Sequence, residues 1–213
     1  MRESAMRKSI AWLVLAVFAG CGGSSLSERE AKKAVRSHLE LAPPFCLPVA
    51  LLQSDPPWVV ADRDPESRVL GSFEQVGLLS SRATTVTEQG YSALGKVTKE
   101  LPAKEFELTA AGRTALVSRT MMGIKASCFR YADADVEEVT EWTEPAEQMG
   151  TVVSRVSFTA KVSSVPAWAQ SETFAQLFPT ESRLLAQAQD EPMPLTAGIV
   201  KTSNGWQPVA ARL

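Results

Sequence analysis

Apolar residues between positions 31 and 42 recur at the spacing of one face of an α-helix. Ser27 stands directly before this run and Glu30 follows three residues later, which is the arrangement of a capping box. Pro43 and Pro44 end the pattern, because proline lacks the amide proton that a helix interior needs. The pattern predicts a helix over residues 28–41, with an apolar stripe made of Ala31, Ala34, Val35, His38, Leu39 and Ala42.

In the middle of the chain the hydrophobic pattern changes several times between helical and strand-like spacing. Gly77 suits the end of a helix, and the threonine-rich stretch after it favours a strand. The expected elements are, in chain order, a helix over 65–76, a strand over 78–86, a loop over 90–103, a strand over 105–108 and a helix over about 109–118.

The last part of the chain favours strands. Residues 151–162 alternate between apolar and polar side chains, as in an antiparallel strand with one buried face. Asn204 and Gly205 form a favoured hairpin turn. The other expected elements are strand-like residues 126–142, one or two short helices over 166–178, and the strands 195–202 and 206–209.

Together these elements predict an α+β fold with two lobes. We expect a mainly helical N-terminal lobe with a small hairpin over residues 27–120. We expect an antiparallel sheet with a helical insert over residues 121–213.

The N-terminus has the pattern of an export signal. Arg7 and Lys8 precede an apolar run over residues 10–19, which is too short to span a bilayer of about 30 Å. The run ends in Gly20-Cys21, and this junction resembles the lipobox of bacterial lipoproteins, with Phe18 where that family usually has leucine.

The lipoprotein resemblance implies that residues 1–20 are a signal peptide, that Cys21 carries the lipid, and that residues 21–26 are a lipidated tether. The alternative is a buried cysteine at the end of a membrane helix. The start codon stays open between Met1 and Met6.

Gly22 and Gly23 bear on localisation, because lipoproteins that stay in the inner membrane commonly carry aspartate just after the cysteine. The resemblance therefore implies the outer membrane, facing the periplasm, with the outer face of the inner membrane as the alternative. Cleavage would remove three basic residues and one acidic residue, which changes the formal net charge from −2 to −4. Such an acidic body needs its lipid to stay on a membrane.

A second resemblance lies between about residues 66 and 118. Residues 73–79, a hairpin and residues 106–113 look like part of a winged helix. The helix that would enter a DNA groove carries Glu66 and Glu74 against Arg68 alone, so it lacks the cations that phosphate contact needs. With the near-neutral overall charge, this predicts no nucleic-acid partner.

Cys46 and Cys128 are the two cysteines that remain after Cys21. In an oxidising compartment an even pair predicts a disulfide, with two separate buried thiols as the alternative. Two cysteines and one histidine do not form a tetrahedral metal set, so we expect no metal and no cofactor.

The chain shows no recognised catalytic set, and we therefore expect no catalytic residues. His38 is the only histidine and lies on the apolar stripe of the first helix, which favours a packing role. Asp133, Asp135 and Glu137 would share one strand face, where a solvated surface is the simpler interpretation and a cation site the alternative. Trp168 is the tryptophan most suited to frame a ligand cleft.

Residues 143–145 and 166–169 also resemble uncharacterised envelope lipoproteins of Gram-negative bacteria. The sequence thus predicts a lipid-anchored envelope protein that binds an envelope protein or a small ligand, or supports envelope structure. The alternative is an envelope hydrolase with a carboxylate-based site.

Overall fold

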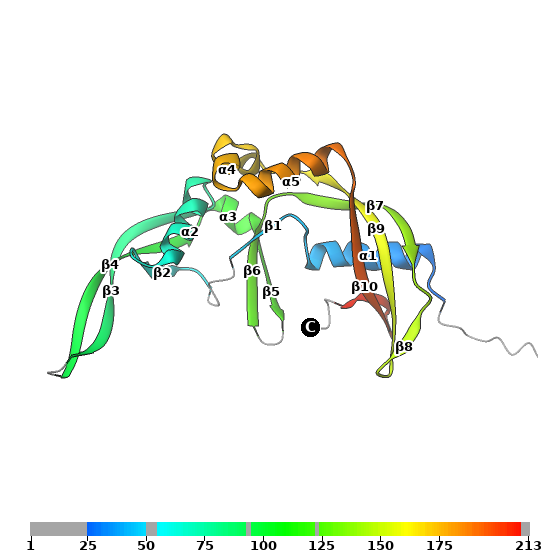
Figure 1. The fold of residues 1–213 in the computed structure, drawn as a ribbon, viewed down its shortest axis with the longest axis horizontal. Helices are drawn as coiled ribbons and strands as arrows, with labels where there is room; N and C mark the ends of the chain where they lie inside the picture. Colours follow the sequence, from blue (N-terminus) through cyan, green and yellow to red (C-terminus); the bar gives the residue numbers. More distant parts are fainter. Residues whose placement is uncertain (1–24, 50–54, 93–94, 122–123, 210–213) are drawn as a thin grey trace, which may run out of the picture.

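The computed structural model describes residues 25–49, 55–92, 95–121 and 124–209. The predicted signal peptide, Cys21 and the first residues of the tether lie outside these ranges. Helices and antiparallel sheets are mixed along the chain, which confirms the α+β class. Three sheets follow one another as an arch, with helices α4 (Glu172–Leu177) and α5 (Pro179–Asp190) at its top (Figure 1). Within the described ranges, no helix has both the length and the apolar character to cross a membrane.

The C-terminal sheet has the order β11-β10-β9-β7, and β8 pairs with β9. The strand predicted over residues 151–162 and the Asn204-Gly205 hairpin are confirmed. Gly205 has a φ of +91°, a left-handed conformation that glycine adopts without steric cost. The strands are β7 (Asp133–Trp142), β8 (Ala146–Gln148), β9 (Thr151–Ser164), β10 (Met193–Thr202) and β11 (Gly205–Pro208).

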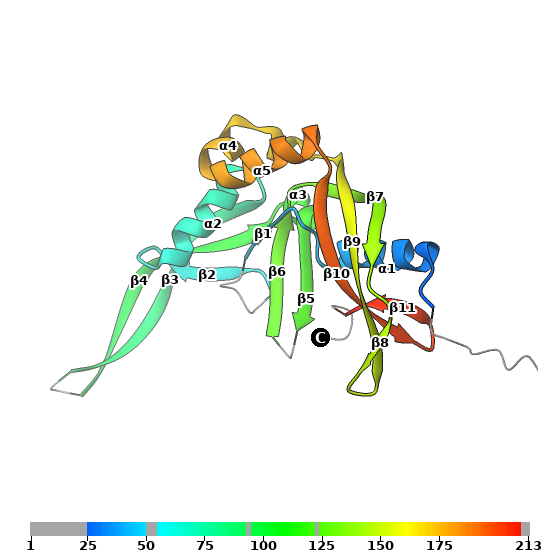
Figure 2. The same cartoon turned by 45° about the vertical axis from the view of Figure 1, so that its right-hand side comes forward.

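Helix α1 (Glu28–Leu41) begins with the predicted capping box. The Glu30 N–H donates to Ser27 Oγ at 3.4 Å, and the Ser27 N–H donates to Glu30 Oε2 at 3.2 Å. The hydrogen bonds from Ser27 lower the pKa of Glu30. The buried face of α1 packs on the C-terminal sheet, where the shared core contains Ala31, Ala34, Val35, Leu39, Val136, Val156, Ile199 and Trp206. The helix therefore belongs by packing to the C-terminal sheet (Figure 2).

The second sheet has the order β2-β4-β3 and is dominated by one long hairpin. Its strands are β2 (Trp58–Ala61), β3 (Leu79–Ser92) and β4 (Gly95–Leu108), and the register runs from Leu79 opposite Leu108 to Ser92 opposite Gly95. The loop predicted over residues 90–103 is therefore wrong. Pro102 fits because its nitrogen lies at the edge of the ribbon, where the missing N–H breaks no ladder bond. This half contains more strand than the mainly helical lobe that we expected.

Two helices flank the hairpin. Helix α2 (Pro65–Gln75) lies in the predicted range. Helix α3 (Ala110–Ala115) starts at the predicted cap, where the Gly112 N–H donates to Thr109 Oγ1 at 3.1 Å, and ends early because a strand begins at Leu116. The order helix, hairpin, helix is the order that the winged-helix resemblance implies, and the resemblance itself stays a prediction.

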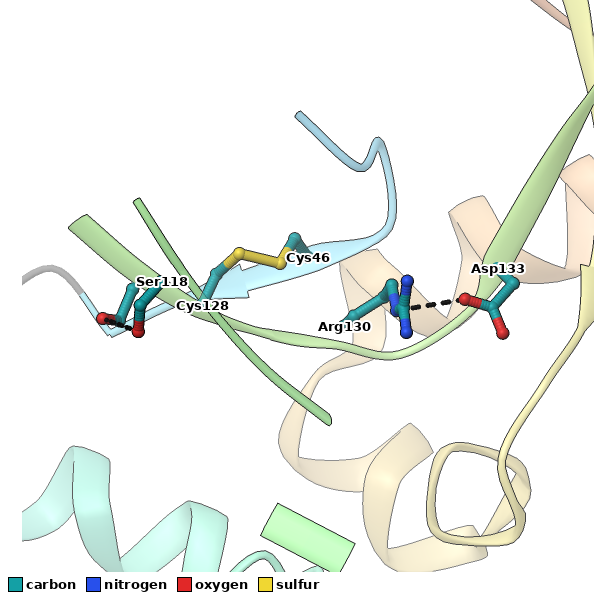
Figure 3. Close-up of a disulfide and its surroundings, with 6 residues drawn as sticks. Cys46, Ser118, Cys128, Arg130 and Asp133 are labelled. Carbon is teal, nitrogen blue, oxygen red and sulfur yellow. Dashed lines mark hydrogen bonds and ion pairs between the residues drawn. A yellow bond between two sulfur atoms is a disulfide. The ribbon is translucent and has the colours of Figure 1, made fainter. Parts of the chain in front are cut away.

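The middle sheet contains the predicted disulfide. Its strands β1 (Cys46–Pro48), β6 (Ile124–Arg130) and β5 (Leu116–Met121) have the order β1-β6-β5. Cys46 and Cys128 are bonded across β1 and β6, with their Cα atoms 5.5 Å apart (Figure 3). The bond thus joins an early and a late segment of the chain within one sheet.

One aromatic core spans both predicted lobes. Phe73 of α2 packs against Phe129 of β6, with ring centroids 4.9 Å apart, and against Phe178 of the helical insert at 5.6 Å. The helical insert, which consists of η1 (Ala167–Gln170), α4 and α5, therefore also covers the N-terminal half. The aromatic members of this core come from both sides of residue 120 and include Phe45, Phe73, Phe106, Phe129, Tyr131 and Phe174.

Candidate functional site

A cleft of about 580 Å³ lies where α3, the β6–β7 junction and the end of β9 meet. Its size is in the range of small-molecule sites. One side is formed by the short side chains of Ala110, Ala111 and Ala115 in α3. The other lining residues are Thr114, Arg130, Ala132, Asp133, Ser164, Val165, Pro166 and Trp168. We call this the Trp168 cleft.

Trp168 lies in the wall of this cleft, where the sequence pattern placed a candidate ligand site. The indole packs edge-on against the buried Phe174, with centroids 5.5 Å apart and planes at 77°. Ser171 Oγ donates to the Trp168 carbonyl oxygen at 2.7 Å and also caps α4. Trp168 is therefore held by the aromatic core while part of it stays exposed to the cleft.

The polar side of the cleft is one ion pair with a supporting hydroxyl group. Arg130 Nε lies 3.0 Å from Asp133 Oδ1 (Figure 3), and Ser164 Oγ donates to Asp133 Oδ2 at 2.6 Å. Among the described residues, no hydrogen bond or ion pair engages the two Nη groups of Arg130. These donors are therefore available to an acceptor in the cleft.

Arg130 is the last residue of β6 and Asp133 the first of β7, and both side chains border the Trp168 cleft. Tyr131 and Ala132 between them are fully buried, and the Tyr131 N–H donates to the Phe45 carbonyl oxygen at 2.9 Å. Burial, with a smaller contribution from the charge of Glu181, raises the pKa of Tyr131 to about 12. The phenol therefore stays neutral at neutral pH.

A smaller hollow of about 140 Å³ adjoins the same segment. It lies between the end of α1 and the start of β7 and shares Arg130, Ala132 and Asp133 with the Trp168 cleft. Arg36 and Glu40 border its other side. The segment from Arg130 to Asp133 thus borders both hollows.

The predicted row of carboxylates is interrupted in the structure. Asp133 is bonded to Arg130 and Ser164, whereas Asp135 and Glu137 are exposed. Register shifts between Asp133 and Ala134 and between Val136 and Glu138 disturb the alternation, because a bulge residue changes which face the following residues occupy. In the described part of the chain, no cluster of three or more possible ligands could hold a metal ion.

The other predicted candidates lie away from the cleft. His38 is half-buried in the last turn of α1 and is not among the residues that line the Trp168 cleft. Asp133 is the one carboxylate among the described lining residues, whereas the hydrolase alternative needs two facing acids. Trp58 and Trp206 are buried, and Trp142 is 38% exposed on β7.

No local sequence pattern points to Arg130 or Ser164 as site residues. Ser164 lies 31 positions from Asp133 and meets it only because β9 pairs with β7. Arg130 could have been noticed as a cation two residues after a predicted disulfide cysteine, although that spacing alone has no specific meaning. No family model, curated protein or solved structure matches the chain.

Proposed function

We propose that the chain is a lipid-anchored protein of the bacterial envelope. It would be held through acylated Cys21 on the periplasmic side of the outer membrane and would bind a small ligand or an envelope protein without catalysis. The observation that supports this proposal most is the Cys46–Cys128 disulfide, because such bonds persist in oxidising compartments outside the cytosol. It leaves Cys21 as the cysteine available for a lipid.

The short tether also supports the proposal. Leu26 is 6% exposed and belongs to the core of α1 and the C-terminal sheet. Five peptide steps separate it from Cys21, and a fully extended chain of that length covers at most about 18 Å. An acyl group on Cys21 would therefore hold the folded body close to the membrane surface.

The Trp168 cleft is our candidate for the ligand site. Trp168, Val165 and Pro166 offer an apolar wall, and the Nη groups of Arg130 offer hydrogen-bond donors. Asp133 balances the charge of Arg130, so the site does not demand a highly charged ligand. We infer a ligand with a flat apolar body and a hydrogen-bond acceptor.

The cleft can be tested with the fluorescent probe 1-anilinonaphthalene-8-sulfonate, which has an aromatic body and acceptor oxygens. We expect Trp168→Ala to weaken probe binding about tenfold, because the apolar wall is removed. Arg130→Gln should weaken it several-fold by removing the charged donors. Fluorescence titration measures both, with melting temperatures recorded for each variant.

Trp142→Ala is the matched control, since Trp142 is an exposed tryptophan at the opposite end of β7. It should leave probe binding unchanged. Equal binding by the Trp168→Ala, Arg130→Gln and Trp142→Ala variants would place the ligand site elsewhere.

The anchor can be tested by metabolic labelling with radioactive palmitate. Wild-type protein should be labelled and partition into detergent, whereas Cys21→Ser should be unlabelled, because a hydroxyl group does not replace the thiol in the thioether linkage. Cys46→Ser is the control that keeps Cys21 and should remain labelled. Label on the Cys21→Ser protein would refute the proposed anchor, and density-gradient separation of the two membranes would test the outer-membrane location.

A further inference from the structure

The outer edge of β3 is an open sheet edge that the proposed anchor and cleft do not use. β3 is the last strand in the order β2-β4-β3. β2 pairs with β4 only over residues 103–106, so farther out the hairpin is a two-stranded ribbon. Both views show this ribbon projecting away from the rest of the molecule (Figures 1 and 2).

One hydrogen bond shows which residues of β3 direct their backbone N–H and C=O groups away from β4. The Ser81 N–H donates to Glu74 Oε1 of α2 at 3.2 Å rather than to β4. Because antiparallel ladders alternate, Ala83, Thr85 and Thr87 also direct their N–H and C=O groups away from β4. Among the described residues nothing bonds these groups, so the free edge begins directly after the residue that Glu74 caps.

The two edges of the ribbon differ in protection. On β4, Pro102 has no N–H, and its carbonyl oxygen accepts from the Asp62 N–H at 3.0 Å. Proline is one of the residues that prevent strand addition at an edge. The β3 edge has no proline between residues 79 and 92 and carries the β-branched run Thr84, Thr85, Val86 and Thr87. This run favours the extended conformation that a pairing strand needs.

The β3 edge is complementary to itself. In an antiparallel pairing that is symmetric about Thr85, Arg82 faces Glu88 of the second copy, and Glu88 faces the second copy's Arg82. Their side chains are 70% and 49% exposed. Arg82 already contacts Glu105 at 2.6 Å, and Glu88 contacts Arg63 at 2.6 Å. The pairing would therefore align charges of alternating sign across the junction, as a two-fold interface requires.

We propose that two copies of this chain pair through the β3 edge, antiparallel and symmetric about Thr85. The two three-stranded sheets then continue as one sheet. The occupant is a second copy rather than an unrelated strand because one short segment supplies both members of each charge pair. Edge pairing buries little surface, so the dimer gains from any anchor that concentrates both copies on one membrane.

The pairing is tested with Thr85→Cys in the full chain, oxidised with diamide in whole producing cells and analysed on a non-reducing gel. In the pairing the two Thr85 Cα atoms lie about 5.5 Å apart, within disulfide range. In the same pairing the two Thr87 residues are not opposite each other. They are offset by four positions, so their Cα atoms lie about 13 Å apart along the strands. We expect at least fivefold more cross-linked dimer for Thr85→Cys than for Thr87→Cys, and wild type gives the baseline from the native cysteines.

A second pair of variants checks that the cross-link depends on the edge. In the Thr85→Cys background, Ala83→Pro removes an N–H from the β3 edge and should reduce the dimer at least fivefold. Glu100→Pro is the matched control, because its N–H lies on the opposite edge beyond β2, and it should keep the dimer. Equal yields for Thr85→Cys and Thr87→Cys, or a cross-linked product that contains a different protein, would overturn the proposal.

Discussion

Replacing Cys46 by serine will lower the free energy of unfolding by about 4–5 kcal/mol, the largest loss that we expect from any single substitution. The two bonded cysteines are 82 positions apart, so the bond removes much of the conformational entropy of the unfolded chain. Urea denaturation without reducing agent measures this loss. Cys128→Ser opens the same loop and should cost the same.

The double variant distinguishes the disulfide from two independent packing roles. If the bond is the source of the stability, Cys46→Ser with Cys128→Ser costs no more than either single change. Losses that add in the double variant, or single variants as stable as the wild type, would contradict the bonded pair.

Gly112→Ala should lower the free energy of unfolding by about 3 kcal/mol. A Cβ atom at this position would collide with the carbonyl oxygen of Leu78 and lie 3.1 Å from Leu108 Cδ2. Leu78 cannot easily retreat, because its carbonyl oxygen accepts from the Thr109 N–H at 3.1 Å and the Thr109 hydroxyl donates to the adjacent Gly77 carbonyl oxygen at 2.7 Å. This close approach explains why residue 112, three positions after the helix cap, is a glycine.

Gly71→Ala is the matched control within another helix. A Cβ at Gly71 meets nothing within 4 Å, so the substitution should stabilise the protein by about 0.5–1 kcal/mol through helix propensity. Thermal and urea unfolding of the two variants should give shifts of opposite sign. Similar shifts for both glycines would show that α3 does not pack on Leu78 as described.

The elements that the sequence predicted best are those that depend on neighbouring residues. The capping box of Ser27 and Glu30, the Asn204-Gly205 turn and the strand over 151–162 follow from local chemistry. The disulfide followed from a count of three cysteines. Trp168 could be named because large aromatic residues in a helix beside a sheet often frame clefts.

The elements that the sequence did not predict depend on distant partners. Residues 90–103 looked like a loop because glycine, proline and lysine weaken the strand pattern, and only pairing with residues 79–92 shows the ribbon. Arg130 and Ser164 become part of one site through sheet pairing, which no local pattern contains. Helix α1 likewise packs on a sheet whose strands lie more than a hundred positions later in the chain. The hydrogen bond from Lys32 Nζ to the Glu137 carbonyl oxygen is one example.

Mass spectrometry of the N-terminal tryptic peptide, from protein purified out of membranes, tests the lipid anchor most directly. We expect a peptide of residues 21–29 that begins at Cys21 and carries a diacylglyceryl group, with or without a further amide-linked acyl chain. A peptide of residues 9–29 with an unmodified Cys21 thiol would show that the chain is neither cleaved before Cys21 nor lipidated on it.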